Sequence, residues 1–540
     1  MTGRAVRLVV IGDALLDRDL TGAVDRIAPD APVPVLAEES TVERPGGAGL
    51  AALLAARDGY DVCLITALAS DVDGDRLRAL LGEVEVRAAG LHGGTPVKTR
   101  VRAARQSLLR IDRGGRPVVD EVPAAALAEI ARADGVLVSD YGRGMAGRPE
   151  VRAALAAAAA RVPVVWDPHP RGAVPVPGTR LVTPNVAEAA QLAGHPPHPA
   201  NGSAPARTGN GSGPARAARN GEPDGNGGLP RGAGPAISGW PGNGNGSGLA
   251  WISRLAAGLV ERWQVGAVAV TMGRSGALLR AGDQPPLVIP ASTVDTGAVY
   301  DTCGAGDRFA ATAAGLLASQ WLPSEAAVGA VRAATEFVLA GAAGALTGPT
   351  RLTGPTAPPG SGGPTRPTRP TGPAGPGGPG GPAARASVVE QVRARGGTIV
   401  ATGGCFDLLH AGHVELLRAA RALGDCLVVL LNSDDSVRRL KGPDRPLVPQ
   451  ADRARLLEAL EPVDATVIFD EDTPAAALAT VRPDIWAKGG DYAGMPLPEA
   501  ATLAGWGGQV VLLPYHEGRS STALIDACRA IIPTQERSRP

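Results

Sequence analysis

The chain contains 540 residues, with 53 basic and 53 acidic side chains, so its formal net charge at pH 7 is zero. This balance argues against a protein that binds nucleic acid or a membrane surface through bulk charge, and any phosphate must then be bound at local sites. A chain of this length exceeds one hydrophobic core, so we expect two or three domains.

Cysteine usage and hydrophobicity bear on the cellular compartment. Five cysteines are dispersed without a Cys-x-x-Cys pair, which is typical of reduced thiols in a cytosol. The N-terminus leads into the apolar run 6–11 without a signal-peptide pattern. No apolar run approaches the roughly 18–20 residues that span a bilayer. We therefore expect a cytoplasmic protein with no nucleic-acid and no membrane partner.

Two low-complexity tracts divide the chain. Residues from about 195 to 248 are mostly Gly, Asn, Pro, Ser, Ala and Arg, and residues 349–386 are rich in Gly and Pro. Neither tract can bury enough apolar surface to offset the entropy of ordering it. We interpret the first as a surface insertion within one domain, 1–348, and the second as a linker to another domain, 387–540.

Apolar runs alternate with alanine-rich helical patterns in the first domain. Runs that are apolar along their whole length predict a parallel sheet with helices on both faces. Two other stretches, 33–42 and 95–112, alternate in polarity and carry charge, which indicates a small accessory sheet. The predicted strands of the main sheet are 8–12, 62–67, 135–139, 162–167, 180–183 and 267–271.

The second domain repeats this α/β pattern on a smaller scale. Its predicted strands are 398–401, 426–432, 465–469, 485–488 and 509–513. The sequence therefore predicts two doubly wound α/β domains of unequal size.

A glycine-rich string precedes the alanine-rich helix predicted at 310–317. Residues 299–309 read Val-Tyr-Asp-Thr-Cys-Gly-Ala-Gly-Asp-Arg-Phe. Gly304 and Gly306 allow a tight turn that presents backbone N–H groups at a helix N-terminus, which favours anions. Asp307 would then lie beside a transferred phosphoryl group and could accept the proton of an attacking hydroxyl. The alternative is a plain Asp-rich loop that caps a helix.

The string Asp-Thr-Cys-Gly-Ala-Gly-Asp at 301–307 resembles the hallmark of the ribokinase family of carbohydrate kinases. The Pro-Gly-Gly-Ala-Gly loop at 45–49 resembles the Gly-Gly loop of the same family. Strings at 26–35, 139–144 and 183–185 resemble more narrowly the kinase half of the bifunctional heptose 7-phosphate kinase and heptose 1-phosphate adenylyltransferase family. The resemblance covers nearly all of 1–348 outside the insertion, and implies a ribokinase-like three-layer sandwich with a small β-lid.

The resemblance implies roles for particular residues. Asp307 would be the base that deprotonates the anomeric hydroxyl, and the amides of Gly304, Ala305 and Gly306 would hold the phosphoryl group. Asp13 and Asp17, after the first strand, would bind sugar hydroxyls, and a solvated turn is the alternative. The Gly-Gly loop adds two further substrate-binding candidates, Gly46 and Gly47.

The string Asn185-Val186-Ala187-Glu188 matches the family's Asn-x-x-Glu motif, which serves ATP and its Mg²⁺. Glu188 is the metal candidate, because a hard cation that bridges phosphates prefers carboxylate oxygen, often through water. Without the resemblance, Asn185 and Glu188 would be a helix cap and its partner at the third helical position.

Three positions depart from the family pattern. Leu50 stands where the family usually has an asparagine that faces the sugar, and Arg143 and His169 stand in place of lysines. An apolar side chain cannot replace a hydrogen-bonding amide, and Arg is not equivalent to Lys at a phosphate. These differences bear on which sugar is used and on the kinase activity itself.

The string Thr-Gly-Gly-Cys-Phe-Asp-Leu-Leu-His-Ala-Gly-His at 402–413 follows an apolar run and precedes a helical pattern at 414–423. It lies on a predicted strand-to-helix turn, where free N–H groups and the helix dipole favour anions. His410 and His413 could donate to phosphoryl oxygens as charge develops there. Two surface histidines are the plain alternative, and a zinc pair lacks a nearby third ligand.

This string resembles the signature of the cytidylyltransferase-like nucleotidyltransferases, and the resemblance covers essentially all of 387–540. It implies that His410 and His413 steady the triphosphate as pyrophosphate leaves. Asp407 would be structural or nucleotide-positioning. Without a base nearby, Cys405 reads as a small buried residue. The remaining nucleotide-binding candidates are Gly404, Cys405, Phe406, Lys441, Arg445, Lys488, Ser520, Ser521 and Thr522.

Together these motifs predict a bifunctional enzyme of ADP-heptose synthesis. ATP would phosphorylate heptose 7-phosphate at C1, and a second ATP would adenylylate heptose 1-phosphate with release of pyrophosphate. ATP and Mg²⁺ are the expected cofactors, sugar phosphates the expected substrates, and a homodimer through the lid is possible. The alternatives are a related fusion with another sugar or CTP, or a regulatory nucleotide-binding protein with a degenerate kinase half.

Overall fold

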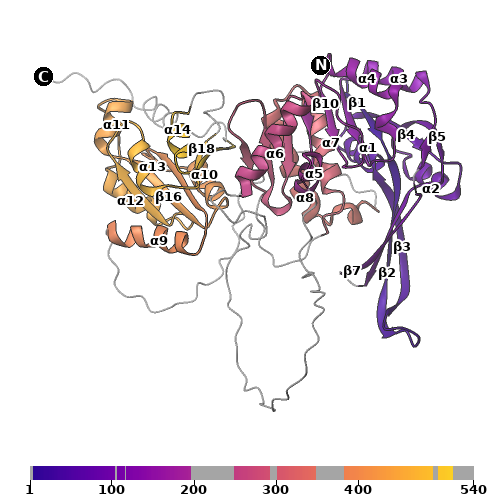
Figure 1. Cartoon of the computed structure of the whole chain (residues 1–540), viewed down its shortest axis with the longest axis horizontal. Coiled ribbons are helices and arrows are strands. Elements are labelled where there is room, and N and C mark those ends of the chain that lie inside the picture. Colours follow the sequence, from indigo (N-terminus) through magenta and orange to yellow (C-terminus); the bar gives the residue numbers. More distant parts are fainter. Residues whose placement is uncertain are drawn as a thin grey trace, which may run out of the picture.

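The computed structural model describes residues 4–103, 106–115, 117–195, 248–291, 301–347, 382–489 and 497–514. Most of the two glycine-rich tracts (196–247 and 348–381) and the C-terminal candidates Ser520, Ser521 and Thr522 lie outside these residues. Residues 382–386, predicted as the end of the linker, instead begin helix α9 (Pro382–Ala394). Figure 1 shows two α/β parts, one from indigo to magenta and one from orange to yellow. None of the described helices has the length and apolar character needed to span a bilayer.

The first part is built on a mostly parallel sheet in the order β14-β13-β12-β11-β10-β9-β1-β4-β5-β8. Its main strands are the buried apolar runs that the sequence predicts. Strand β13 runs antiparallel to both β12 and β14, and β8 runs antiparallel to β5, which the sequence does not predict. The short connections on either side of β13 permit this direction. The bounds are β1 (Arg7–Gly12), β4 (Asp61–Leu68), β5 (Glu85–His92), β8 (Val118–Val119), β9 (Gly135–Ser139), β10 (Val164–Asp167), β11 (Leu181–Val182), β12 (Val268–Thr271), β13 (Ala277–Arg280) and β14 (Leu287–Ile289).

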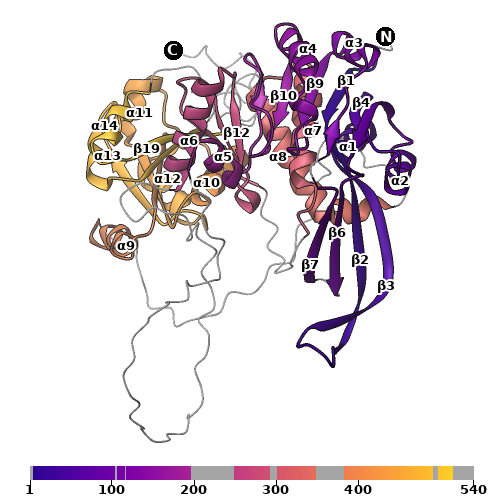
Figure 2. The same ribbon diagram turned by 45° about the vertical axis from the view of Figure 1, so that its right-hand side comes forward.

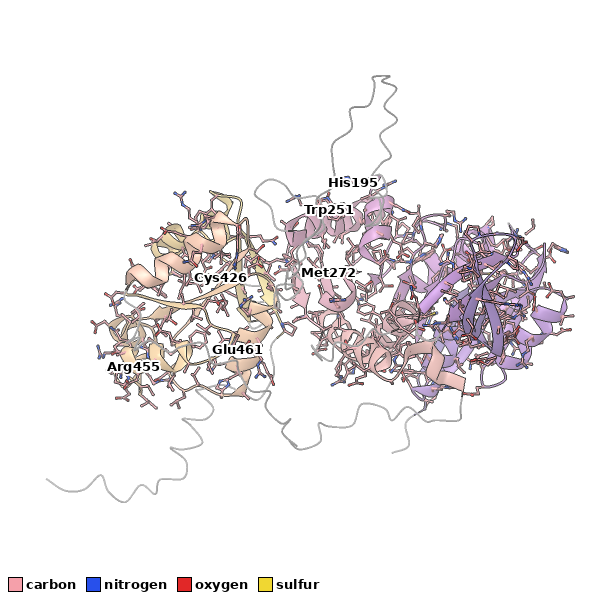
Figure 3. All side chains as sticks on the ribbon, turned by 90° about the horizontal axis from the view of Figure 1, so that it is seen from below. His195, Trp251, Met272, Cys426, Arg455 and Glu461 are labelled. Carbon is pink, nitrogen blue, oxygen red and sulfur yellow. The ribbon has the colours of Figure 1, made fainter. Side chains whose placement is uncertain are left out.

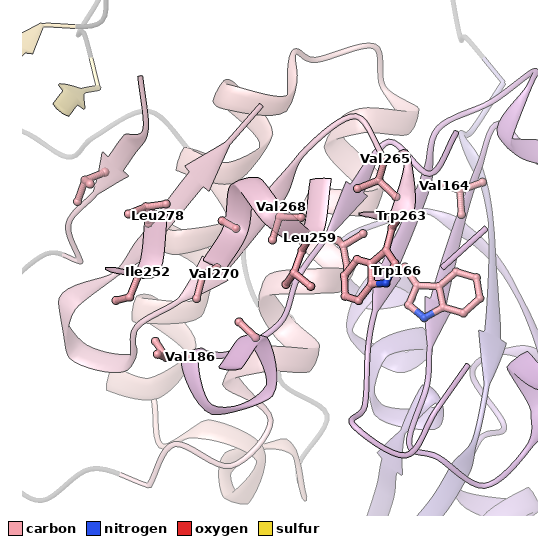
Figure 4. Close-up of a cluster of buried hydrophobic side chains, with 14 of the residues drawn as sticks. Val164, Trp166, Val186, Ile252, Leu259, Trp263, Val265, Val268, Val270 and Leu278 are labelled. Carbon is pink, nitrogen blue, oxygen red and sulfur yellow. The ribbon is translucent and has the colours of Figure 1, made fainter. Parts of the chain in front are cut away.

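Helices cover both faces of this sheet, as the unbroken apolar strands require. One face packs on α3 (Ala124–Arg132), α4 (Pro149–Ala159), α5 (Val186–Leu192) and α6 (Gly248–Trp263). The other face packs on α1 (Ala48–Arg57), α2 (Val72–Leu80), α7 (Ala305–Ala318) and α8 (Pro323–Leu339). Figure 4 shows the first face, where Trp166 of β10 and Trp263 of α6 lie together among valine and leucine side chains.

A separate four-stranded sheet, which we call the lid, has the order β3-β2-β6-β7. Its strands are β2 (Ala14–Ile27), β3 (Pro34–Gly47), β6 (Val97–Ala103) and β7 (Gln106–Arg113). They project from one end of the first part (Figures 1 and 2). The accessory sheet predicted at 33–42 and 95–112 is thus confirmed, but β2 was not predicted, because its many charged residues obscure the strand pattern.

The second part has a five-stranded parallel sheet in the order β17-β16-β15-β18-β19. The five predicted strands are confirmed as β15 (Ile399–Gly404), β16 (Cys426–Asn432), β17 (Ala465–Phe469), β18 (Ile485–Gly489) and β19 (Gln509–Leu513). Two helices, α10 (Ala411–Arg421) and α12 (Gln450–Glu458), pack on one face. The other face packs on α9 (Pro382–Ala394), α13 (Ala475–Val481) and α14 (Glu499–Ala504). Helix α11 (Asp434–Lys441) follows β16.

The two sheets meet at β14 and β19. Leu287 pairs with Leu512 in parallel register, and the Leu512 N–H donates to the carbonyl of Pro286 at 2.9 Å. Each of these strands would otherwise be an open edge, and mutual pairing covers both edges.

Candidate active sites

The turn before α7 is shaped by Gly304. This residue has a φ of +81°, and a Cβ there would lie 2.7 Å from Cδ2 of Leu50. Glycine is thus needed both for the left-handed backbone and for the space. Leu50 is 1% exposed and packs beneath the turn, so it supports the turn from below and offers no hydrogen bond to a sugar. The turn leads directly into the first helical residues, Ala305 and Gly306.

Asp307 lies buried in the first turn of α7. The hydroxyl of Tyr141 donates to its Oδ1 at 2.8 Å. The pKa of Asp307 is raised to about 7, chiefly by burial; the charges of Asp17 and Glu188 add to the rise, while Tyr141 and Lys98 oppose it. A carboxylate with a pKa near neutral suits general-base work, because it is both ionised and basic at that pH.

A cavity of about 320 Å³, which we call the lid cavity, opens between the lid and Asp307. Three of its lining residues, Lys98, Arg100 and Arg102, alternate along β6. Alternate residues of a strand share one face, so these three cations face the cavity together. These three residues were not predicted as site residues, although their period-two spacing within 95–112 was the signal that could have indicated them.

Carboxylates hold both arginines of this set in place. Arg100 contacts Asp17 at 3.1 Å, and Arg102 contacts Asp301 at 2.7 Å. Each carboxylate engages one guanidinium nitrogen of its arginine. Because a guanidinium has five N–H donors in a planar fork, the pairing fixes its orientation and leaves further donors for a ligand. Asp17 lines the lid cavity, which is compatible with its predicted sugar contact.

Asp13 has a different environment from Asp17. Its carboxylate accepts hydrogen bonds from the backbone N–H groups of Tyr141, Arg143 and Met145, at 3.0, 2.9 and 3.2 Å. Asp13 therefore holds the 141–145 turn, and it does not line either described cavity. This geometry favours a positioning role over the sugar contact that the resemblance implied.

The two glycines of the Gly-Gly loop serve close packing. A Cβ on Gly46 would lie 2.7 Å from Oδ2 of Asp17. Gly47 has a φ of +59°, and a Cβ there would lie 2.5 Å from the Asp13 carbonyl and 3.2 Å from the Tyr141 ring. Gly47 also lines the lid cavity. Both positions need glycine because a larger residue would displace the groups around Asp307.

A second cavity, of about 190 Å³, lies on the other side of Asp307 and we call it the nucleotide cavity. Asn185 and Glu188 line it and form a reciprocal capping box at α5, with both hydrogen bonds at 2.9 Å. The side chain of Val186 is in the core, whereas Ala187 is exposed. The cap that was the alternative interpretation is therefore present, and the same two side chains also face the cavity.

The nucleotide cavity is rich in carboxylates. Asp140, Asp167, Glu188 and Asp307 all line it, and burial raises the pKa of each. Crowded, desolvated carboxylates favour a cation among them. Among the residues described, no group of three or more ligating side chains is arranged to hold a metal ion by itself. Of these carboxylates, Glu188, which the capping box holds in place, fits a Mg²⁺ that is held partly by nucleotide phosphates.

Two of the departures from the family pattern lie near these cavities. His169 lines the nucleotide cavity, and its Nδ1 accepts the backbone N–H of Arg171 at 3.1 Å. The side chain of Arg143 donates to the Gly114 carbonyl at 3.2 Å. That contact ties the 141–145 turn to the end of the lid.

In the second part, His410 is the N-cap of α10 and His413 lies in its first turn. Their rings stack with centroids 3.9 Å apart, and the ring of Phe406 lies 5.2 Å from that of His413. Burial and His410 lower the pKa of His413 to about 4, so this ring is neutral near pH 7 in the free protein. A neutral imidazole donates through one ring nitrogen only.

Asp407 is a structural residue of the motif loop. Its carboxylate pairs with the buried side chain of Arg445 and accepts the N–H groups of Leu447 and Val448 at 2.7 and 3.0 Å. This supports the structural role expected for Asp407. Arg445, which was expected to contact phosphate, is 8% exposed and engaged with that carboxylate.

Arg453 has a structural role that the sequence motifs did not indicate. It is completely buried, and its guanidinium donates to the carbonyls of Cys405, Asn432 and Val448 and to the carboxylate of Asp434. These acceptors belong to the motif loop, the end of β16, the start of α11 and the chain before α12. Arg453 therefore joins the segments that surround the motif.

The predicted lysines differ in environment. Lys441 is exposed at the end of α11. Its charge opposes the burial that raises the pKa of Cys405 and adds to the burial that lowers the pKa of His413, so it lies near the motif. Lys488 is half-buried at the end of β18, where its Nζ contacts Glu499 of α14 at 2.8 Å. Gly404 ends β15, and a Cβ there would lie 3.3 Å from the Phe406 ring.

Comparisons with known proteins match a carbohydrate-kinase family in the first part of the chain and a nucleotidyltransferase family in the second. The family description "pfkB family carbohydrate kinase" matches residues 6–208, and "Cytidylyltransferase-like" matches residues 401–526. The "Bifunctional protein HldE" of Streptomyces coelicolor is 50% identical over 521 residues, which are 96% of each chain. The protein of the same name from Caulobacter vibrioides is 35% identical over 529 residues, again 96% of each chain. A ribokinase structure from Arabidopsis thaliana with ribose and ATP has a TM-score of 0.42 at 18% identity and covers 62% of this chain and 93% of its own.

Proposed function

The chain belongs to the family of bifunctional HldE proteins, which join a carbohydrate kinase to a nucleotidyltransferase, and from this premise we propose how its residues make an ADP-activated heptose. The kinase phosphorylates heptose 7-phosphate at C1 with ATP. The transferase then joins AMP from ATP to heptose 1-phosphate and releases pyrophosphate. We assign these steps to 1–348 and 387–540, connected by the linker 349–386.

One observation carries the kinase assignment: Asp307 lines both cavities of the first part. With the sugar in the lid cavity and ATP in the nucleotide cavity, its carboxylate accepts the proton of the C1 hydroxyl. The C1 oxygen then attacks the γ-phosphorus, and the bond to the β–γ bridging oxygen breaks. The amides of Gly304 and Gly306, at the start of α7, stabilise the transferred group. The Ala305 N–H, the third donor expected, is engaged by the Thr302 carbonyl at 3.1 Å.

The cations of β6 suit a substrate that already carries a phosphate. Lys98, Arg100 and Arg102 face the lid cavity, and Ser107 of β7 adds a hydroxyl. Alternate residues of a strand are separated by about 6.6 Å, so these donors form a row that leads away from Asp307. The reacting C1 hydroxyl and the 7-phosphate occupy opposite ends of the sugar. Such a row can therefore bind the 7-phosphate while Asp307 deprotonates the C1 hydroxyl.

Both steps use ATP, and we propose Mg²⁺ as the ion that accompanies it. Glu188 would hold the ion together with the nucleotide phosphates, and Asn185 would orient Glu188 through the capping box. When bound, Mg²⁺ offsets the charge that develops on the phosphates during transfer.

In the transferase, we propose that the oxygen of the sugar 1-phosphate attacks the α-phosphorus of ATP directly. His410 and His413 donate to the triphosphate from the start of α10, while Lys441 and Lys488 add positive charge. Gly404, Cys405 and Phe406 shape the loop at the end of β15. Arg445 acts on this loop through Asp407.

The lid also offers a surface for a second copy of the chain. Leu108, Leu109 and Ile111 of β7 are exposed by 40%, 57% and 40%. Burying such side chains in a homodimer would remove apolar area from water. We further propose a cytoplasmic location, because both steps consume ATP and the four cysteines among the described residues are free thiols.

The test is a product assay by mass spectrometry with purified protein. We expect heptose 7-phosphate and ATP to give a bisphosphate, and heptose 1-phosphate and ATP to give ADP-heptose. The two sugars are supplied separately because the kinase product retains its 7-phosphate. CTP and other sugar phosphates are run in parallel, and a faster reaction with any of them would replace this substrate assignment.

A further inference from the structure

Tyr141 is held at four points around the kinase site. Its backbone N–H donates to Asp13, and Gly47 leaves the space that its ring occupies. The ammonium of Lys98 lies 4.6 Å from the ring centroid, and the hydroxyl donates to Oδ1 of Asp307 at 2.8 Å. A tyrosine that only filled space would not need its hydroxyl directed at the base.

We propose that Tyr141 is a positioning residue for phosphoryl transfer, which fixes the carboxylate of Asp307 and favours its ionised form, with Lys98 reinforcing this through the tyrosine ring. This inference rests on the proposed kinase function and deepens it. Tyr141 acts through Asp307 and exchanges no proton in the step.

Hydrogen-bond direction supports this role. The phenol can donate to a carboxylate, and burial together with the charge of Asp307 keeps the pKa of Tyr141 well above its usual value. Tyr141 therefore remains a donor at the pH where Asp307 ionises. A hydrogen bond to the charged form of an acid favours that form. With Oδ1 engaged by Tyr141, Oδ2 is the oxygen that accepts the proton of the sugar hydroxyl.

The other charges around Asp307 show why such a donor is needed. Asp17 from the lid, Glu188 from α5 and Asp167 from β10 all face it and disfavour a further negative charge. Lys98 on β6 is the cation that opposes them, and it lies on the face of the Tyr141 ring. A cation on that face is attracted by the ring quadrupole, so the lid strand, the tyrosine and the base form one connected unit.

The test compares Tyr141→Phe with wild type in the full-length protein. Kinase kcat/KM for heptose 7-phosphate is measured with ATP across the pH range that brackets neutrality. Wild type should lose activity as the pH falls through about 7, where Asp307 becomes protonated. In Tyr141→Phe this acidic limb should move to higher pH by about one unit, the effect of one lost hydrogen bond to a charged group. At a pH well below both pKa values, kcat/KM of Tyr141→Phe should therefore be about tenfold lower than that of wild type.

Tyr60→Phe is the matched control. Tyr60 is also partly buried and packs on the same helix, α7, at Gly315, far along the helix from Asp307. Its loss should leave the acidic limb in place. Lys98→Met is the second variant: it keeps the Tyr141 hydroxyl but removes the cation over its ring, and should move the limb in the same direction by a smaller amount.

The pH profiles of wild type and the variants test the role of Tyr141 and the kinase function separately. An upward shift in Tyr141→Phe with none in Tyr60→Phe supports it. A Tyr141→Phe enzyme that keeps the wild-type limb, at any rate, would show that the hydroxyl does not favour ionised Asp307 and would overturn it. Wild type that phosphorylates no sugar phosphate at any pH would overturn the proposed function, and the inference with it.

Discussion

Arg453→Met tests how one buried side chain organises the transferase. Arg453 is 0% exposed and donates to three backbone carbonyls and to the carboxylate of Asp434. Methionine fills a similar volume but donates nothing, so all four acceptors lose their partner. We expect the motif loop at 402–413 to lose its fixed position, because the Cys405 carbonyl is one of these acceptors.

The size of the effect follows from the acceptors left behind. An unsatisfied buried polar group costs about 1–3 kcal/mol, and breaking a buried charge pair by removing one partner costs about 3–5 kcal/mol. Asp434 is 25% exposed and can be rehydrated, so we expect about 4 kcal/mol in total, within the range for a broken pair. With a urea slope of about 2 kcal/mol per molar, the midpoint of unfolding should fall by about 2 M.

The assay follows residual adenylyl transfer and residual kinase activity in the same urea series. Arg453→Met should inactivate the transferase at lower urea while the kinase midpoint stays unchanged. Arg455→Met is the matched control, because Arg455 lies two residues away on the outside of the second part (Figure 3) and its ion pair with Asp452 is exposed. A transferase midpoint in Arg453→Met equal to that of Arg455→Met would refute the reasoning.

Three further predictions concern the two sites. Gly304→Ala should reduce kinase activity at least tenfold, because its Cβ would clash with Leu50 at a φ of +81°; steady-state kinetics would show it, and a normal rate would contradict the packing argument. His413→Ala should lower adenylyl transfer about 100-fold, and His413→Gln should recover part of it, because a pKa of about 4 makes the ring a neutral donor; equal losses in the two variants would argue against a donor role. Glu499→Gln should raise the KM for ATP severalfold in the transferase, since it weakens the contact at 2.8 Å that directs Lys488; an unchanged KM would remove Lys488 from the nucleotide site.

The parallel strands could be predicted because their cause lies within each strand. Runs such as 135–139 and 426–432 are apolar up to their last residue, and both appear as strands with the predicted bounds. The antiparallel edge formed by β13 and β14 could not be inferred, because strand direction depends on the connections and not on composition.

The lid shows the opposite case. Strand β2 carries several charged residues and was not predicted, with a solvated turn near Asp17 as the alternative interpretation, yet it pairs along its length with β3. Its charges are satisfied by partners distant in sequence, such as Arg44 for Asp19 at 2.6 Å. Lys98, Arg100 and Arg102 were not predicted for a similar reason. A strand that alternates charged residues has the pattern of a solvent-exposed face, and only the tertiary structure shows that this face lines the lid cavity.

Motifs predicted the position of residues on the fold better than the partners of their side chains. Asp307, His410 and His413 lie at helix starts, as their spacing predicted. Asp13 and Arg445 are engaged with backbone or carboxylate groups instead. A sequence indicates that a charge is present near a turn, but the partner of that charge is decided by tertiary packing.

The central claim is that two independent sites act in tandem, one around Asp307 and one around His413. The most direct measurement is the mass-spectrometric product assay on wild type, Asp307→Asn and His413→Ala, each supplied separately with heptose 7-phosphate and with heptose 1-phosphate. Asp307→Asn should form no bisphosphate but still form ADP-heptose, and His413→Ala should show the reverse. Bisphosphate formation by Asp307→Asn at the wild-type rate, or undiminished ADP-heptose from His413→Ala, would contradict the account.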